Sequence, residues 1–316
     1  MRGYVKTVQG VVFALPVATQ WEFQYTAGIP CDSFLYCCPW DAGGDTGVVD
    51  WQEFYALEGE ETVFYGVVDE CETSISEKGA LLEVSGRGMA ALLLDNEALG
   101  QDYATATLDD ILRNHVTPYG IQVAERKQLS PVSRFSVSVG SSEWSVLYDF
   151  CRYYNGVMPR FNQQGQLVLS GWKDDTVVKV DDGVAVMELV CLDRRYGILS
   201  EILVRDKVRQ VVETLGNQEF LRSGGRCRRV LTMPGRSDYQ TMRFSGQFQL
   251  NKSNGDLLRL ELEVAQTFFA RPGELVQLQR TGWGRNGIYR AVEVQAGEDV
   301  RGGWSRLKLA AADIVM

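Results

Sequence analysis

Short β-type segments at both ends of the chain constrain its fold more than any other feature. Val48–Ala56 and Glu61–Val68 are rich in β-branched and aromatic residues, and Leu257–Val264 alternates between apolar and polar positions. Residues with turn chemistry separate such segments, as at Asp41–Asp45 and Glu77–Gly79. Short strands at this spacing are typical of an antiparallel barrel or sandwich, so we expect a mainly β fold.

The middle of the chain has a different pattern, which is typical of a smaller α/β module. Thr107 precedes an apolar run with acids in its first turn, and this predicts a helix that ends before Gly120. A second helix is predicted from a buried stripe with i, i+3, i+4, i+7 spacing, made of Trp144, Leu147, Tyr148 and Cys151. The sequence thus predicts a β region at 1–100, an α/β module at 101–172 and a second β region at 173–316.

The two β regions contain a faint internal repeat. Residues 64–95 and 286–313 both have a glycine near a strand start, an acid at its end, a loop and then an alternating strand. Two unrelated hairpins could match this well by chance. The other interpretation is that two copies of one β unit flank the α/β module.

Charge is unevenly distributed along a chain whose formal net charge is −9. Residues 1–100 hold 4 Lys/Arg and 16 Asp/Glu, a net of −12, whereas residues 191–243 hold 11 Lys/Arg and 6 Asp/Glu, a net of +5. One explanation of this uneven charge is ordinary surface variation. The other is that the two segments form complementary faces, which meet when subunits associate. The sequence pI near 4.9 argues against tight nucleic-acid binding, which favours a basic domain.

The cysteines and the N-terminus indicate synthesis in a cytoplasm. The seven cysteines are odd in number and include no C-x-x-C pair, so we expect reduced, mostly buried thiols. The apolar run at the N-terminus is short and is broken by Gln9 and Pro16. It is a poor signal peptide and too short for a membrane span, so no membrane partner is expected.

No group of residues predicts a catalytic, cofactor-binding or metal site. His115 is the single histidine and lies near the end of a predicted helix, where a structural role is favoured. Cys37 and Cys38 are adjacent and lack metal-ligand spacing. Six grouped carboxylates offer no distinguished acid–base pair and are expected on a solvated surface: Glu58, Glu60, Glu61, Asp69, Glu70 and Glu72.

Three further motifs are expected to be structural. Gly86–Ala91 fits G-x-G-x-x-A, but the helix after it is short and no parallel strand with a closing acid follows. Gly282–Gly287 fits G-x-G-x-x-G, but a strand follows it, so we expect a hairpin loop. Arg222–Arg229 contains four arginines, for which an acidic neighbour is favoured over a phosphate.

Five segments taken in order resemble the baseplate hub proteins of contractile phage tails and tailocins, the Mu-type hub and its relatives. They are PCDSFLYCCPWD (30–41), VFYGVVDECETSISEKGALLEVSGRGMAALLLDNEA (63–98), TLDDILRNHVTPYGI (107–121), EWSVLYDFCRYYNGVMPRFNQQGQLVLS (143–170) and PGELVQLQRTGWGRNGIYRAVEV (272–294).

The resemblance implies two tail-tube-like antiparallel β-barrels that flank an α/β insertion. It implies a structural subunit without catalytic residues, whose homotrimer forms a pseudo-hexameric ring joining the tail tube to the central spike. Tail tube, spike and baseplate wedge proteins are the expected partners, and a virion or tailocin baseplate is the expected location. If the ring encloses a channel, part of the acidic excess in residues 1–100 is expected to face it, because lysine and arginine would hold passing DNA.

Two other classes of function fit parts of the sequence. A β-rich receptor- or carbohydrate-binding tail protein could stack sugars on tryptophans such as Trp21, Trp40, Trp51 and Trp283, although core packing is their commoner fate. A cell-wall hydrolase would need a carboxylate pair, and a test on peptidoglycan would reveal its activity.

Overall fold

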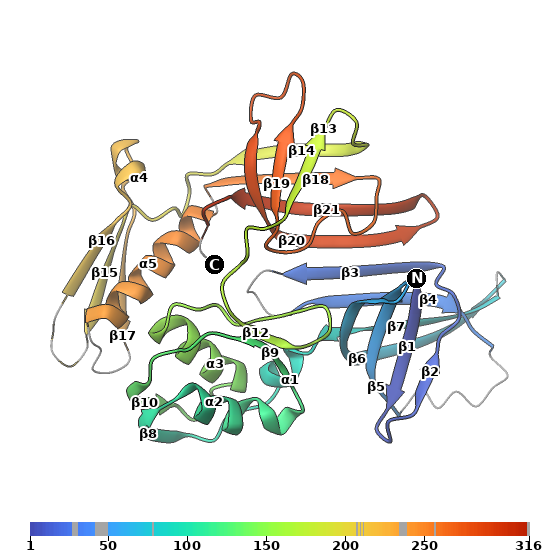
Figure 1. Ribbon diagram of the computed structural model, residues 1–316, viewed down its shortest axis with the longest axis horizontal. Coiled ribbons are helices and arrows are strands. Elements are labelled where there is room, and N and C mark those ends of the chain that lie inside the picture. The colour runs from blue at the N-terminus through green and yellow to red at the C-terminus, as the bar shows by residue number, and fades with distance from the viewer. Residues whose placement is uncertain are drawn as a thin grey trace.

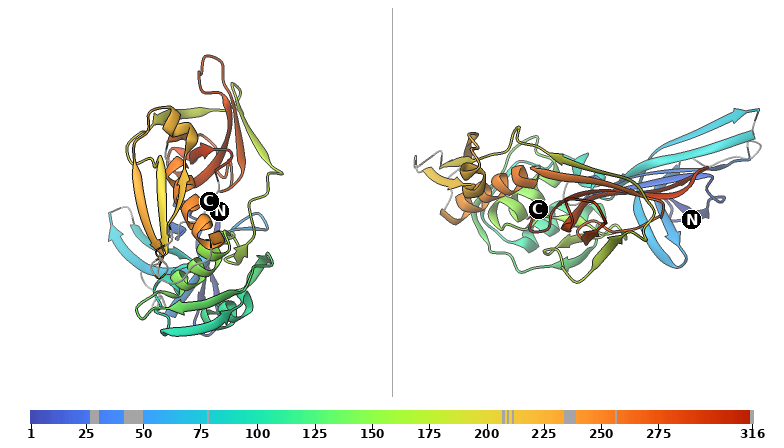
Figure 2. Two further views of the ribbon diagram at one scale, coloured as in Figure 1. Left: turned by 90° about the vertical axis from the view of Figure 1, so that its left-hand side faces the viewer. Right: turned by 90° about the horizontal axis from the view of Figure 1, so that it is seen from above.

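The computed structural model describes residues 1–26, 31–41, 50–77, 79–206, 208, 210, 212–233, 239–255 and 257–314. The strands stack into a long, twisted sheet, and smaller helical parts lie to one side of it (Figures 1 and 2). Parts of several predicted turns, including 42–45, Lys78 and Asp256, lie outside the described residues, as do Val48 and Val49.

Among the described residues, seven strands form the N-terminal β region. Buried and exposed side chains alternate along β3 and β4, so that one face of each strand packs into the core. The strands are β1 (Arg2–Thr7), β2 (Val12–Ala14), β3 (Gln20–Thr26), β4 (Ser33–Pro39), β5 (Trp51–Glu58), β6 (Glu61–Ser76) and β7 (Gly79–Gly88).

The α/β module follows β7 and has a core of its own. Its helix α2 (Leu108–His115) begins at the predicted cap, where the Thr107 hydroxyl accepts from the Asp110 N–H at 3.2 Å, and Gly120 adopts a left-handed φ of 72° after it. Three of the four predicted stripe residues of the second helix are buried, and Tyr148 is partly buried. The elements are α1 (Ala91–Leu94), β8 (Gln101–Ala106), α2, β9 (Val123–Arg126), β10 (Val132–Val137), α3 (Glu143–Tyr148), a π-helical segment (Asp149–Tyr154), β11 (Arg160–Phe161) and β12 (Leu167–Leu169).

The C-terminal β region contains an insertion that the strand pattern did not reveal. Between its second and third strands, a small sheet packs against the longest helix, α5, around a third core. The main strands are β13 (Val177–Asp181), β14 (Val186–Asp193), β18 (Leu258–Val264), β19 (Leu275–Gln279), β20 (Gly287–Asp299) and β21 (Gly302–Ala311). The insertion holds β15 (Glu201–Asp206), β16 (Val212–Gly216), α4 (Gln218–Arg222), β17 (Arg228–Met233) and α5 (Tyr239–Gly255).

The two β regions share one sheet of 13 strands and one hydrophobic core. They meet where β3 pairs with β20, from Trp21 opposite Glu298 to Thr26 opposite Glu293. Phe268 of the C-terminal region stacks on Trp21 with ring centroids 5.3 Å apart. The mainly β prediction is confirmed, but two separate closed barrels are not, because the described strands form one continuous open path from β14 to β2.

Each β region nevertheless contains the same five-stranded unit. In the first unit, the strand order is β3-β4-β7-β6-β5. In the second unit, the order is β14-β18-β21-β20-β19, because β19 pairs with β20. The hairpins β6–β7 and β20–β21 turn at Ser76↔Gly79 and at Asp299↔Gly302, and both have a β-bulge the same number of pairs from the turn. The faint sequence repeat therefore corresponds to strands with matching order, direction and register.

Asp32 lies between β3 and β4, where the N-terminal sheet meets the α/β module. Its Oδ1 accepts from the Thr26 N–H at 2.8 Å, and burial raises the pKa of Asp32 to about 7. Because an unfolded aspartate has a pKa of about 3.9, the folded protein binds more protons between about pH 4 and pH 7. Stability from this group is therefore highest at low pH and falls as the pH rises through that window.

We expect Asp32→Asn to flatten this pH dependence, since an amide has no proton to lose. Urea unfolding at pH 5 and pH 8 should show a larger loss of stability in the wild type than in the variant. Asp175→Asn, at an exposed position, is the control and should change little. A difference between wild type and Asp32→Asn that stays constant across this range would contradict the assignment.

Candidate functional site

Several sheet edges are unpaired among the described residues, and two of them, one in each of the two five-stranded units, form the candidate site for assembly. One is the part of β6 beyond the bulge, Glu70–Ile75, which pairs with β7 on one side alone. The other is β14, which pairs with β18 alone. The β6–β7 hairpin extends away from the body (Figure 2, right). An exposed edge offers a row of backbone donors and acceptors to another strand.

Apolar side chains lie on both edges. Ile75 on β6 is 77% exposed, and on β14 Met187, Val190 and Leu192 are 57%, 42% and 45% exposed. An open strand edge that carries apolar side chains is suited to pairing with another strand, so these two edges are candidates for contact with a partner.

The bulge that directs the β6 edge is held by glycines and ion pairs. Gly66 and Gly86 lie where a side chain would overlap the opposite strand, so the two strands cross closely just before the bulge. Arg87 Nε contacts Asp69 Oδ2 at 2.7 Å, and its Nη2 contacts Asp95 Oδ2 at 2.7 Å. The Arg87 guanidinium holds the pKa of Asp95 below its usual range. The Gly86–Ala91 motif therefore has a structural role: Gly86 allows the two strands to approach closely, and Arg87 forms the ion pairs beside the bulge.

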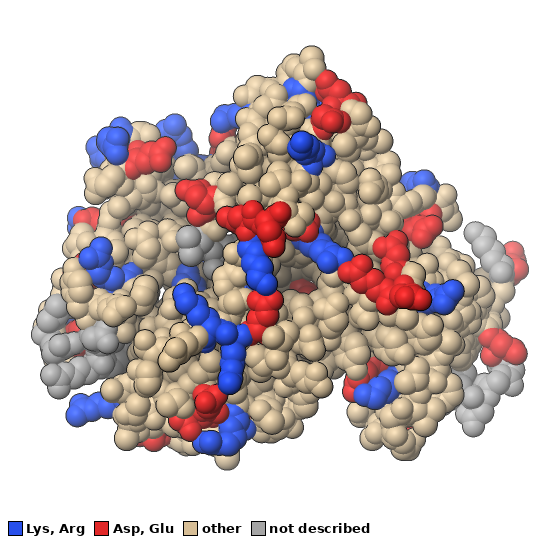
Figure 3. Space-filling model, viewed as in Figure 1, with Lys and Arg blue, Asp and Glu red and all other residues tan. Residues whose placement is uncertain are grey.

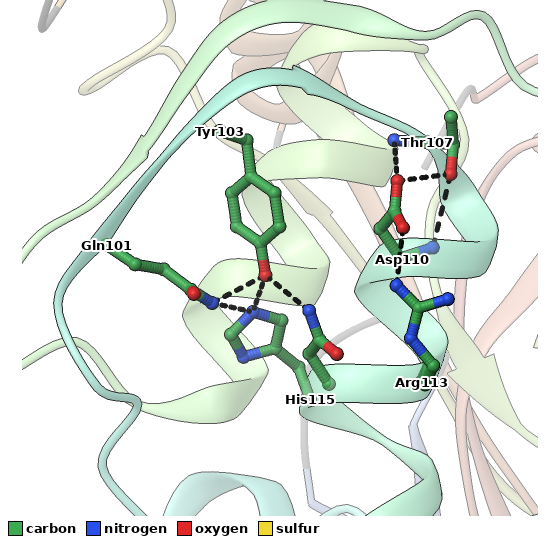
Figure 4. A network of polar contacts seen from close by, with 7 residues as sticks. Gln101, Tyr103, Thr107, Asp110, Arg113 and His115 are labelled. Carbon is green, nitrogen blue, oxygen red and sulfur yellow. Dashed lines mark hydrogen bonds and ion pairs between the residues drawn. The ribbon is translucent and has the colours of Figure 1, made fainter.

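His115 is enclosed in the α/β module and is 2% exposed. Its Nδ1 lies 2.6 Å from Glu143 Oε2 and its Nε2 lies 2.9 Å from the Tyr103 hydroxyl, while Tyr119 donates to Glu143 Oε1 at 3.1 Å. Tyr103 also accepts from Asn114 and lies by Gln101 at the surface of this network (Figure 4). The imidazole thus joins α2 to α3 and is closed to a substrate, which supports the structural role.

The grouped carboxylates are spread from the β5–β6 turn along β6. Glu58, Glu60 and Glu61 lie at the β5–β6 turn, whereas Asp69, Glu70 and Glu72 lie about 25 Å further along β6 at strand spacing. Glu61 is paired with Arg271 at 2.5 Å. No set of three His, Cys, Asp or Glu side chains that could hold a metal occurs in the described part of the chain.

The remaining motifs also have structural surroundings. Gly282–Gly287 forms the loop between β19 and β20, as predicted. In the arginine-rich segment, Arg228 Nε contacts Glu201 Oε2 at 2.5 Å, so an acidic neighbour within the chain meets it. Acidic and basic side chains are interspersed over the face in Figure 3.

The tryptophans considered for sugar stacking pack into the core. Trp21 and Trp51 are 3% and 7% exposed, and Trp40 and Trp283 are partly buried against the same core. None of the described helices is long and apolar enough to cross a membrane.

Solved structures with a similar fold include phage tail proteins and a component of a type VI secretion system. A tail protein of prophage MuSo2 from Shewanella oneidensis matches with a TM-score of 0.81 and 18% identity over 100% of both chains. A tail protein from Neisseria meningitidis MC58 matches with a TM-score of 0.80 and 15% identity, over 99% of this chain and 97% of that one. The E. coli c3393 protein, a type VI secretion component described as similar to T4 tail proteins gp27 and gp5, matches with a TM-score of 0.64 and 11% identity, over 98% and 77%. The fold is thus that of a tail protein.

The family comparison narrows this class. Residues 90–171 match the second domain of the baseplate hub protein gp44-like family. No curated protein matches the sequence. The family match covers the α/β module, and the structural matches cover the whole chain. The resemblance to baseplate hub proteins is therefore confirmed: one domain of that family matches the α/β module, and the whole chain has the fold of solved tail proteins.

Although Glu70 is one of the grouped carboxylates, the sequence did not predict that the β6 and β14 edges are unpaired. Their signals were the hairpin repeat, which marks β6 and β20 as counterparts, and the opposite charges of residues 1–100 and 191–243.

Proposed function

We propose that the protein is the structural baseplate hub subunit of a contractile tail, of a phage or a tailocin. Three copies form a ring of six similar β units, which joins the six-fold tail tube to the three-fold central spike. The repeated five-stranded unit carries this proposal, because one chain then offers two equivalent surfaces to a six-fold neighbour. Tube, spike and wedge proteins are its partners, and the chain itself performs no reaction.

The domain division follows from the same proposal. Residues 1–100 and 173–316 each supply one tube-like unit, and residues 101–172 supply the module between them. The ring encloses an axial channel, which part of the acidic excess of residues 1–100 lines. This arrangement would let DNA or protein pass without tight binding.

An image of the assembled tail tests the proposal. We expect three copies of the 35.4 kDa chain per baseplate, between tube and spike, with carboxylates facing the channel. Native mass spectrometry of isolated baseplates gives the copy number independently. Six copies per tail, or a channel lined mainly by lysine and arginine, would contradict the model.

A further inference from the structure

One junction between two five-stranded units is already formed within the chain. Beyond its bulge, β20 pairs with β3 from Glu293 opposite Thr26 to Glu298 opposite Trp21. Side chains support this register, since Trp21 Nε1 donates to Glu298 at 3.0 Å and Gln24 Nε2 donates to Glu293 at 3.2 Å. At this junction, the β20 edge of the second unit pairs with the β3 edge of the first unit.

The counterparts of these two edges in the repeated unit are both unpaired within the described chain. Matching the hairpins at turn and bulge makes Glu70–Ile75 of β6 the counterpart of Glu293–Glu298. Matching the neighbouring strands makes residues 189–194 the counterpart of 21–26, because β14 lies on β18 as β3 lies on β4. For this type of junction, each chain therefore has one unpaired β6 edge and one unpaired β14 edge.

We propose that Glu70–Ile75 of one copy pairs antiparallel with residues 189–194 of a second copy, in the register of the internal junction. This inference rests on the proposed function, since it describes how the copies of the ring join. The register places Glu70 opposite Arg194, Thr73 opposite Cys191 and Ile75 opposite Leu189.

The side chains at these positions fit one another. Glu70 belongs to the acidic N-terminal part of the chain and Arg194 to the basic segment, so opposite charges face each other. Ile75, which is 77% exposed in the single chain, meets Leu189, which is partly buried against the core. Complementary charge and apolar contact at the two ends of the segment favour this register over a slipped one.

A single chain cannot make this junction by itself. β14 is the end strand of the stack, and β6 lies on the far side of β3, β4 and β7 (Figure 1). The contact is therefore between copies and joins two different surfaces. Head-to-tail contacts of this kind close into a ring or continue as a filament.

Disulfide trapping tests the register. Directly opposed residues on antiparallel strands have Cα atoms about 4.5–5.5 Å apart, within the range of a disulfide. Under mild oxidation of the full-length protein, we expect Thr73→Cys to form an interchain bond with the native Cys191. The product should run as a covalent ladder on non-reducing gels, at least about ten-fold stronger than in the wild type.

Three controls make the result specific. Ser74→Cys places the thiol on the opposite sheet face from Cys191 and should not crosslink. Thr73→Cys combined with Cys191→Ser should lose the ladder, and the wild type measures the background of the seven native cysteines. Each substitution on β6 is at an exposed position, so the fold should be retained.

The outcomes separate this inference from the proposed function. A Cys191-dependent ladder that ends at three chains supports both, and one that continues beyond three supports the strand pairing but contradicts the ring of three. Trimers that form without this crosslink, or equal crosslinking by Ser74→Cys, would overturn the pairing and leave the ring intact. Absence of both crosslink and trimer would overturn both.

Discussion

The free energy of unfolding is expected to fall by about 3–5 kcal/mol when Phe23 is replaced by alanine. Phe23 is fully buried on β3, and its ring centroid lies 5.2 Å from that of Phe64 and 6.4 Å from that of Phe268. These neighbours come from both β regions, so the cavity would weaken the place where the regions are joined. Urea unfolding followed by fluorescence measures the loss.

Phe13→Ala is the matched control, because this ring on β2 is 47% exposed and should contribute much less. Since the two regions share a core, we expect them to unfold together in wild type and in Phe23→Ala. Limited proteolysis along the urea gradient would detect a surviving half. A variant in which residues 173–316 stay folded after 1–100 unfolds would show that the shared core does not couple them.

Gly86→Ala is expected to destabilise the protein by about 3 kcal/mol, near the upper end of the usual range for overpacking. A Cβ at this position would overlap the carbonyl oxygen of Val67 on the opposite strand and lie 2.8 Å from Cε1 of Phe34. The first contact is with backbone, so relief requires the β6–β7 strands to move apart next to the bulge. Thermal unfolding and urea unfolding both measure the effect.

Gly284→Ala provides the comparison within the other glycine-rich motif. A Cβ there would meet no atom within 4 Å, and we expect a change within about 0.5 kcal/mol. Equal effects of the two substitutions would show that close strand approach at Gly86 is not what requires glycine there.

Local chemistry was sufficient to predict individual elements. The capping box at Thr107 and the left-handed Gly120 each act over a few residues, and the structure confirms both. The insertion was not predicted, because its longest helix lacks a clear local signal in the sequence. α5 has no strong amphipathic stripe, because its buried side chains are distributed between the β15 sheet and the α/β module, as at Phe248, whose ring lies 3.5 Å from the Arg152 guanidinium.

The union of the two β regions could not be predicted from the sequence. Pairing of β3 with β20 joins residues nearly a chain length apart, and nothing local distinguishes Trp21 from a tryptophan in a separate barrel. The assembly edges were hidden similarly, since an exposed Ile75 and a buried isoleucine look alike in an alternating strand. The repeated hairpin is the sequence signal that relates the β6 edge to β20. The repeat is weak in sequence, but its strand pairs match one by one in the structure.

The connection between β14 and β18 shows where such a chain can gain new parts. Its counterpart between β3 and β4 is short, yet this one carries a folded unit with its own core, and both pairs of strands keep the same alignment. Lengthening a connection costs little free energy when its ends are already fixed. Evolution can therefore exchange whole accessory units at this point without disturbing the repeated framework, and the same point suits the insertion of a reporter domain.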